Sequence, residues 1–434
     1  DVVRTAVYGQ LSGPRRRLIH LKVASRLEED AKAGSDVASE IAHHAALAGE
    51  TAMAARACVQ AGRRYLRQFA NAEADAVARR GQRYAETSSD EERVPLTLRL
   101  LAIRYEAQAP TDRDEAGKLI ESLSEQAIDL GLLEAARAGF QLLADVRWEG
   151  GDMSKADAYM RRAEFLTRGG TDRERILGLG EAARCLVILD KDLPEAEAML
   201  LEAHALAQRT GVEHESLEDA QGLLRQFHGD HEEASRLFGK ARDLSRRHGN
   251  RLHEFFALEH LIIAEMERGR RDTAQTFCAE LEQLGEKIRD GSELPMARAL
   301  GALCRFTHSE GDATATDLEA AIEVLRLADA KQRLSVVLTI ASRLLLERGL
   351  PEQARTMAEE ALICVRSLGR PNDIARVLSS LVQTCAAQGD DEAHDEYFDA
   401  LLRLSQEPLS NHVKRLVDAT LVAGQTQMED AEVD

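Results

Sequence analysis

The sequence predicts an all-α protein built as a right-handed superhelix of about nine helical hairpins. Two observations carry this prediction. Hydrophobic residues make up 44% of the 434 residues, but aromatic residues only 4%, and there are just 8 prolines. This mixture favours helices over strands. The second observation is an internal repeat with a period of about 40 residues, which is typical of stacked helical units.

The repeat is clearest in residues 131–170, where an apolar-periodic helix, a Gly-Gly-Asp turn and a second helix carrying Ala156 and Ala163 follow one another. The first of these alanines has counterparts 38 to 42 residues apart along the chain. Small side chains at this position let two helices approach closely. Two helices per period with such a position are typical of tetratricopeptide-like repeats. The positions are Ala74, Ala116, Ala156, Ala196, Ala234, Ala274, Ala315, Ala354 and Ala393.

Short turns separate the two helices of most predicted hairpins. A glycine there can adopt the left-handed conformation that ends the first helix, and an aspartate after it can cap the second. The turns are Gly150-Gly151-Asp152, Asp190-Lys191-Asp192, Gly229-Asp230, Gly269-Arg270, Gly311-Asp312, Gly349-Leu350 and Gly389-Asp390.

We expect the chain to have four parts. Ser12 and Pro14 suit the start of a helix over 15–29, which links the first part to the repeats. The last ten residues are acidic and lack the apolar side chains needed to form a core. The parts are the end of an adjoining winged-helix or arm-like domain with a linking helix (1–36), the repeat superhelix (37–406), a C-terminal capping helix (407–424) and a disordered acidic tail (425–434).

Charge and cysteine content restrict the partners and the location. The formal net charge of −19 argues against direct contact with nucleic acid or an anionic membrane, because both require a basic surface. No run approaches the ~18–20 apolar residues of a membrane span. The six cysteines show no C-x-x-C spacing, so we expect reduced core cysteines and a cytoplasmic protein. They are Cys58, Cys185, Cys278, Cys304, Cys364 and Cys385.

The search for catalytic motifs predicts no enzyme, no metal site and no cofactor. No H-E-x-x-H, G-x-S-x-G or phosphate-binding P-loop pattern occurs. The pair Gly178 and Gly180 lacks the third glycine of a dinucleotide fingerprint and falls inside a predicted helix. His228 and His231 bracket a turn that could grip a metal ion, but such an arrangement is more often a plain surface turn.

Three segments, Tyr8–His20, Ile41–Gly49 and Phe69–Ala74, resemble the junction of STAND-class signal-transduction ATPases. This group includes large LuxR-type regulators of the maltose-activator kind and cyclase- or kinase-linked relatives. Its members join a nucleotide-binding and winged-helix part to a tetratricopeptide-like superhelix. The resemblance implies that this chain is the sensor or arm region of a larger protein, whose ATPase switch and output domain lie outside it.

The geometry of tetratricopeptide repeats places certain first-helix residues in the concave groove. They precede the small alanine of the second helix by 8, 11, 15 or 18 positions, a rule carried over from the repeat class. We take them as candidate partner-binding residues. They are Gln141, Asp145, Trp148, Glu181, Asp219, Gln226, Phe256, Glu259 and Arg343.

Glu181, Asp219 and Glu259 occupy the same column in three consecutive repeats. An acidic column would suit a basic or amine-bearing partner by charge complementarity, although in a chain with 75 acidic residues such a column can also arise by chance. Trp148, the single tryptophan, is either an aromatic anchor in the groove or a hairpin core residue.

These observations favour a non-catalytic module that recognises a protein, a peptide or a small-molecule inducer and acts on its own ATPase domain elsewhere. One alternative is a constitutive structural adaptor or oligomerisation scaffold. A remoter alternative is an enzyme whose site is assembled from groove residues.

Overall fold

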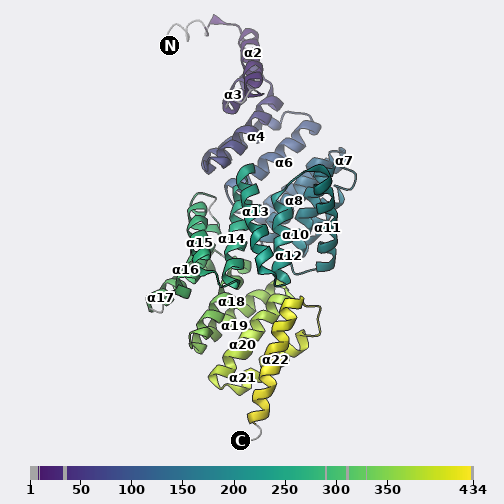
Figure 1. The fold of residues 1–434 in the computed structure, drawn as a ribbon. Coiled ribbons are helices and arrows are strands. Elements are labelled where there is room, and N and C mark those ends of the chain that lie inside the picture. Colours follow the sequence, from purple (N-terminus) through teal and green to yellow (C-terminus); the bar gives the residue numbers. More distant parts are fainter. Residues whose placement is uncertain are drawn as a thin grey trace. The chain divides into compact units, whose positions relative to one another are not determined.

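A computed structural model of the chain describes residues 8, 10–32, 37–288, 291–308, 312–328 and 330–431. Over these ranges 21 helices follow one another and no strand occurs, which confirms the all-α prediction (Figure 1). The helices are α2 (Gly13–Lys32), α3 (Ala38–Ala48), α4 (Thr51–Arg67), α5 (Asn71–Ala85), α6 (Asp90–Ala107), α7 (Arg113–Asp129), α8 (Leu133–Glu149), α9 (Met153–Phe165), α10 (Asp172–Ile188), α11 (Leu193–Thr210), α12 (Glu215–Phe227), α13 (His231–His248), α14 (Arg251–Glu267), α15 (Arg271–Gly285), α16 (Glu293–His308), α17 (Asp312–Leu327), α18 (Lys331–Glu347), α19 (Pro351–Leu368), α20 (Pro371–Gln388), α21 (Asp391–Leu404) and α22 (Asn411–Ala431).

Nine hairpins, from α4/α5 to α20/α21, correspond to the nine predicted repeats. The small alanine lies on the second helix of each hairpin, and in six of the nine it is buried. In α7, α17 and α21 it is half-buried. In α21 the buried side chains are His394, Phe398 and Leu401, so the packed face of this helix is rotated relative to the prediction. The six buried alanines are Ala74, Ala156, Ala196, Ala234, Ala274 and Ala354.

The turns within the hairpins follow the predicted chemistry. Gly229 has a φ of 81°, in the left-handed region that glycine adopts without strain, and the amide of Asp230 donates to the carbonyl of Arg225 at 2.9 Å. The carboxylate of Asp230 then accepts from the amide of Glu233 at 3.2 Å, capping α13. Asp190 takes the left-handed conformation itself, with a φ of 56°. Gly311 lies outside the described residues.

The chain divides into two compact units. Unit 1 comprises Asp1–Val146 and Phe165–Gly169, and unit 2 comprises Arg147–Glu164 and Gly170–Asp434. In unit 1, α2 packs against α3 and α3 against α4. The domain boundary expected at residue 36 lies between α2 and α3, and it stays a prediction.

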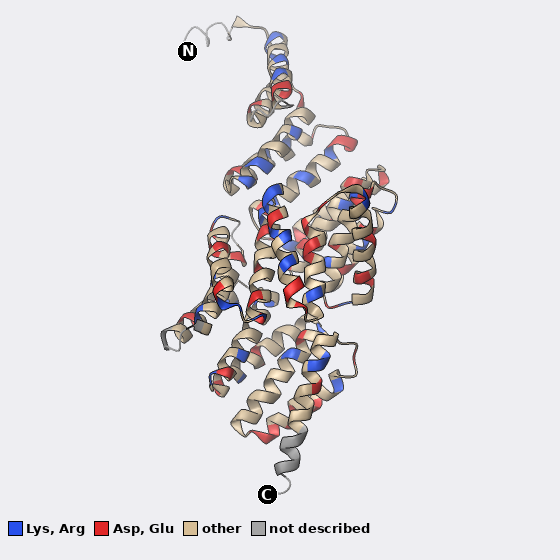
Figure 2. Ribbon diagram, in the orientation of Figure 1, with Lys and Arg blue, Asp and Glu red and all other residues tan. Residues whose placement is uncertain are grey.

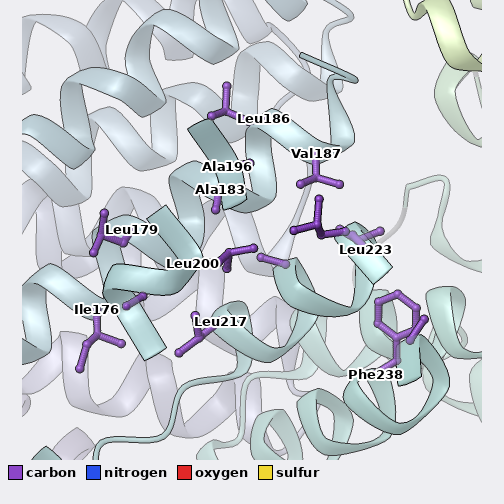
Figure 3. Close-up of a cluster of buried hydrophobic side chains, with 14 of the residues drawn as sticks. Ile176, Leu179, Ala183, Leu186, Val187, Ala196, Leu200, Leu217, Leu223 and Phe238 are labelled. Atoms are coloured by element: carbon purple, nitrogen blue, oxygen red, sulfur yellow. The ribbon is translucent and has the colours of Figure 1, made fainter. Parts of the chain in front are cut away.

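The core of unit 2 includes a cluster of buried apolar side chains from consecutive helices (Figure 3). Ile176 and Leu179 of α10 lie in this cluster with Leu200 of α11, Leu217 of α12 and Phe238 of α13. Each helix contributes side chains spaced three or four positions apart, so one face of it is buried. Burying such side chains is the main source of stability in a repeat fold.

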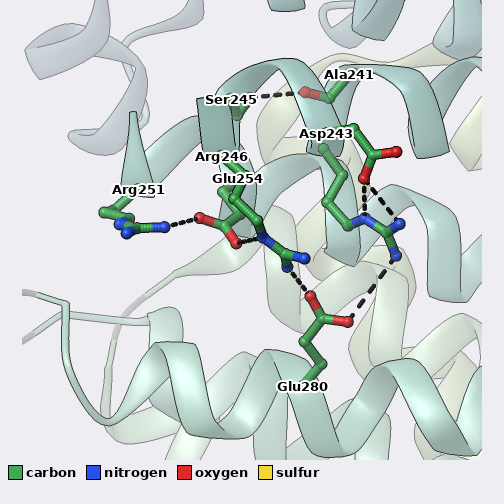
Figure 4. Close-up of polar contacts among 8 residues, drawn as sticks. Ala241, Asp243, Ser245, Arg246, Arg251, Glu254 and Glu280 are labelled. Atoms are coloured by element: carbon green, nitrogen blue, oxygen red, sulfur yellow. Dashed lines mark hydrogen bonds and ion pairs between the residues drawn. The ribbon is translucent and has the colours of Figure 1, made fainter. Parts of the chain in front are cut away.

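Ion pairs connect neighbouring hairpins of unit 2 as well. Figure 4 shows Arg246 of α13 between the carboxylates of Glu254 in α14 and Glu280 in α15, with Arg251 on the other side of Glu254. The side chain of Arg246 is 46% exposed. Because solvent screens exposed pairs, the pair between Arg246 and Glu280 contributes ~1 kcal/mol or less to stability.

The structure differs from the sequence prediction at the end of the C-terminal helix. Helix α22 runs from Asn411 to Ala431, so the capping helix continues through most of the segment predicted to be a disordered tail. Glutamine, methionine, glutamate and alanine are good helix formers, which lets a helix that has already begun propagate through residues 425–431. Residues 432–434 lie outside the described residues. All six cysteines are free, in agreement with the expected reduced state, and the Sγ atoms of Cys278 and Cys304 lie 3.4 Å apart.

Within the described ranges, no helix combines the length and apolar character that crossing a membrane requires.

Gly222 and Gly239 form a matched pair that tests the packing of unit 2. A Cβ atom added at Gly222 would lie 2.6 Å from Cε1 of Phe238, whereas one at Gly239 would meet nothing within 4 Å. Alanine stabilises a helix interior by ~0.5–1 kcal/mol relative to glycine. We expect Gly239→Ala to raise the thermal unfolding midpoint slightly. Overpacking costs roughly 1–3 kcal/mol, so Gly222→Ala should lower it. Equal midpoints for the two variants, measured by circular dichroism, would contradict this packing.

Candidate functional site

A network of charged and aromatic side chains connects the first helices of several hairpins in unit 2. We call it the inner network. It contains Arg184 of α10, Asp219 of α12, Phe256, Glu259 and His260 of α14, Glu293 of α16 and Arg333 of α18. Positive and negative residues are interspersed along the helices of this unit (Figure 2).

Asp219 forms one end of the inner network. Its two carboxylate oxygens lie 2.9 Å from Nε of Arg184 and 2.9 Å from Nδ1 of His260. Burial alone would raise the pKa of Asp219, but the charge and hydrogen bond of His260, together with those of Arg184, outweigh it and hold this pKa well below the usual range. The carboxylate is therefore ionised and fully paired within the chain.

Arg333 forms the other end. Its guanidinium lies 3.2 Å from a carboxylate oxygen of Glu259 and 3.3 Å from one of Glu293. The same guanidinium lies 5.7 Å from the ring centre of Phe256, and that of Arg184 lies 5.2 Å from it. Both distances are within the range of cation–π attraction. Phe256 thus joins the two ends of the inner network, and Arg333 reaches a glutamate 74 positions earlier in the chain.

Three further contacts join parts of unit 2 that are remote in sequence. Nε2 of Gln332 donates to the carbonyl of Trp148 at 2.8 Å, across 184 positions. Asp190 and Asn372 bond across 182 positions. Glu267 of α14 accepts from Arg343 of α18 at 3.0 Å and lies 3.4 Å from Arg376 of α20. We call these the closing contacts, because they connect hairpins that are not sequence neighbours.

The closing contact at Asp190 places a carboxylate at the start of α20. Asp190 accepts hydrogen bonds from the backbone amide of Asn372, at 2.6 Å, and from its side-chain amide. The Asn372 side-chain oxygen in turn accepts from the amide of Ser410 at 2.8 Å. Burial raises the pKa of Asp190 to about 6, although the bonds from Asn372 oppose this shift. At neutral pH the Asp190 carboxylate is therefore mostly ionised, although its burial favours the protonated form.

The structure brings some of the candidate residues together and separates others. Asp219, Phe256 and Glu259 all belong to the inner network, while Arg343 belongs to a closing contact. Glu181 is buried. The remaining candidates are half-buried. Gln226 and Trp148 lie in unit 2, whereas Gln141, which accepts from Arg137 at 2.9 Å, and Asp145 lie in unit 1.

Two residues of the acidic column pair with bases of the same chain, and the third is buried. Asp219 pairs with Arg184 and His260, Glu259 pairs with Arg333, and Glu181 is buried. At Asp219 and Glu259 this pairing removes the reason for expecting a basic partner. Arg184 and Arg333 are not among the residues predicted from the sequence, because no spacing in the sequence indicates which hairpins meet across the interior.

The described residues contain no group of three histidine, cysteine, aspartate or glutamate side chains able to hold a metal ion. His231, one of the two turn histidines, packs edge-on against the ring of His412, with ring centres 5.4 Å apart.

Comparisons with known proteins agree with the fold. No protein-family profile matches the sequence, and no curated protein matches it. Among solved structures, a Rap protein complexed with Competence and Sporulation Factor is 11% identical, with a TM-score of 0.56 over 82% of this chain and 98% of that one. The Rap conjugation gene regulator of plasmid pLS20, in complex with the Phr* peptide, is 13% identical, with a TM-score of 0.47 over 80% and 95%. The fold is thus a tetratricopeptide-like helical repeat.

The pKa of Asp190 predicts a pH dependence of stability. Its pKa is higher in the folded protein than in the unfolded chain, so the folded state binds more protons between about pH 4 and 6, and this group's contribution to stability falls as pH rises through that window. Asp190→Asn removes the titration. We expect the stability of this variant relative to wild type to rise by about 2 kcal/mol from pH 4.5 to 7.5, measured by urea unfolding. A difference that does not change with pH would contradict this.

Arg333 and Arg326 offer a second matched comparison. Arg333→Met leaves the buried carboxylates of Glu259 and Glu293 without their cation, and breaking such a pair costs roughly 3–5 kcal/mol. Arg326 also binds two carboxylates but is more exposed, so Arg326→Met should cost ~1 kcal/mol or less. Thermal unfolding of both variants measures the difference. A smaller loss for Arg333→Met than for Arg326→Met would show that the inner network does not stabilise the fold.

Proposed function

We propose that this chain is a non-catalytic recognition module that binds a peptide or protein partner along the interior of unit 2. One observation carries the proposal. The interior where the first helices α10, α12, α14, α16 and α18 meet is lined by charged and aromatic side chains and not by apolar side chains alone. A surface needed only to hold hairpins together would be packed with aliphatic residues.

Ion pairs suit a surface that exchanges partners. A guanidinium such as that of Arg343, 43% exposed and paired with Glu267, can bind a partner's carboxylate in place of its own. Small rotations between repeats change the width of such an interior without disrupting any hairpin. The likeness to the Rap protein complexed with Competence and Sporulation Factor supports the proposal, because in that protein a similar fold is found together with a partner.

The finer proposal is that the module is the sensor or arm of a STAND-class regulator and restrains an ATPase domain of the same protein. It rests on the resemblance of residues 8–20, 41–49 and 69–74 to that group. In this setting the bound partner, or a small-molecule inducer, changes how strongly the module restrains the ATPase domain. The protein acts in the cytoplasm.

The experiment is a peptide selection. Peptides are selected from a random library on the immobilised chain, and their affinities are measured for wild type, Arg343→Gln and Arg366→Gln. Arg366 is an exposed arginine at the end of α19 and serves as the control. We expect Arg343→Gln to weaken binding at least tenfold while Arg366→Gln leaves it unchanged.

Two results would count against recognition. Absence of any enriched peptide, together with a mass that rises with protein concentration in sedimentation, would favour the constitutive scaffold. Peptides that lose affinity equally in both variants would bind somewhere other than the interior.

A further inference from the structure

An open hollow of about 470 Å³ lies between the turn that follows α12 and the first half of α22. This volume falls within the range of ~300–1,000 Å³ that is usual for ligand pockets. The hollow lies wholly within unit 2. The residues that line it are His228, Asn411, Lys414, Arg415 and Asp418.

Two cations of α22, Lys414 and Arg415, line this hollow. Lys414 and Arg415 are exposed, and neither forms an ion pair with any residue in the described ranges. Arg415 donates only to the carbonyl of Asn411 in its own helix, at 3.3 Å. In a chain with a net charge of −19, carboxylates are abundant, and many arginines of unit 2 are paired with them. Lys414 and Arg415 lie side by side at a concave surface, so both are available to bind an anion.

The surroundings of the hollow reinforce its positive character. Next to His412, which follows the lining residue Asn411, Arg376 shares the carboxylate of Glu267 with Arg343. Burial, together with the positive charges of Arg376 and Arg415, lowers the pKa of His412, so this imidazole is held neutral by cations already present.

Among the side chains that line the hollow, cations outnumber carboxylates. Asp418 is the one carboxylate in the lining, and Lys414 and Arg415 are its two cations. The lining therefore carries an excess of positive charge.

We propose that this hollow binds a carboxylate-bearing stretch of the partner, that is, an acidic peptide segment. Lys414 and Arg415 contact its carboxylates, and the Arg415 guanidinium can bind one through two parallel hydrogen bonds. The side chains of His228 and Asn411 supply further hydrogen-bonding groups at the rim. The inference rests on the proposed function and specifies the partner's chemistry, which is the opposite of the basic partner that the acidic column had indicated.

The test measures binding of a fluorescent, N-acetylated tetraglutamate peptide to the whole chain, with tetraglutamine as the neutral control. Charge reversal in Lys414→Glu/Arg415→Glu is compared with the same reversal in Arg173→Glu/Arg366→Glu, at two exposed arginines away from the hollow. We expect tetraglutamate binding that weakens at least tenfold in the first variant, is unchanged in the second, and declines with added salt. Lys414→Gln/Arg415→Gln, with an unfolding curve for each variant, shows that any loss reflects charge and not unfolding.

The inference is overturned if wild type binds tetraglutamate no better than tetraglutamine, or if both reversal variants lose binding equally. Binding of inorganic phosphate without binding of tetraglutamate also overturns it and assigns the hollow to phosphate. In each of these cases the peptide selection described above still decides the proposed function, because peptides of another chemistry could depend on Arg343 alone.

Discussion

The arrangement of unit 2 depends on hydrogen bonds and ion pairs between hairpins that are far apart in sequence. In most repeat proteins each unit contacts only its neighbours. Here the carboxylate of Asp190 reaches the first turn of α20, and Gln332 reaches the carbonyl of Trp148. These contacts bring first helices from different parts of the unit to a common interior. The chemistry of that interior, including the pairing of Arg333 with two glutamates, follows from this approach.

The closing contacts also decide what the interior offers to a partner. A column of acidic residues can bind a basic partner only if no base of the same chain already pairs with its carboxylates. Asp219 already pairs with Arg184 and His260, so its negative charge is balanced inside the protein. The charges that remain available are those that the fold leaves unpaired, and at the hollow beside α22 these are positive. Composition alone, with its large negative net charge, indicates the reverse.

Features that depend on local sequence could be predicted, and features that depend on the pitch of the superhelix could not. The small alanines, the glycine turns and the number of hairpins follow from spacings within about 40 residues, as at Ala234 and Gly229. The pairing of Arg333 with Glu259 spans 74 positions and depends on the rotation accumulated over two hairpins, which no local pattern encodes. The rotated face of α21 had a weak local signal, because Phe398 is too large for an exposed position.

The distance in sequence between Asp190 and Asn372 has a consequence for how unit 2 folds. Contacts within a hairpin close short loops and lose little chain entropy, whereas the bond between these two residues requires a chain of 182 residues to return on itself. We therefore expect the hairpins to assemble before the coil closes. In that order of events an open coil with every hairpin intact precedes the native structure, and we expect the same open coil to form first when the native structure loosens.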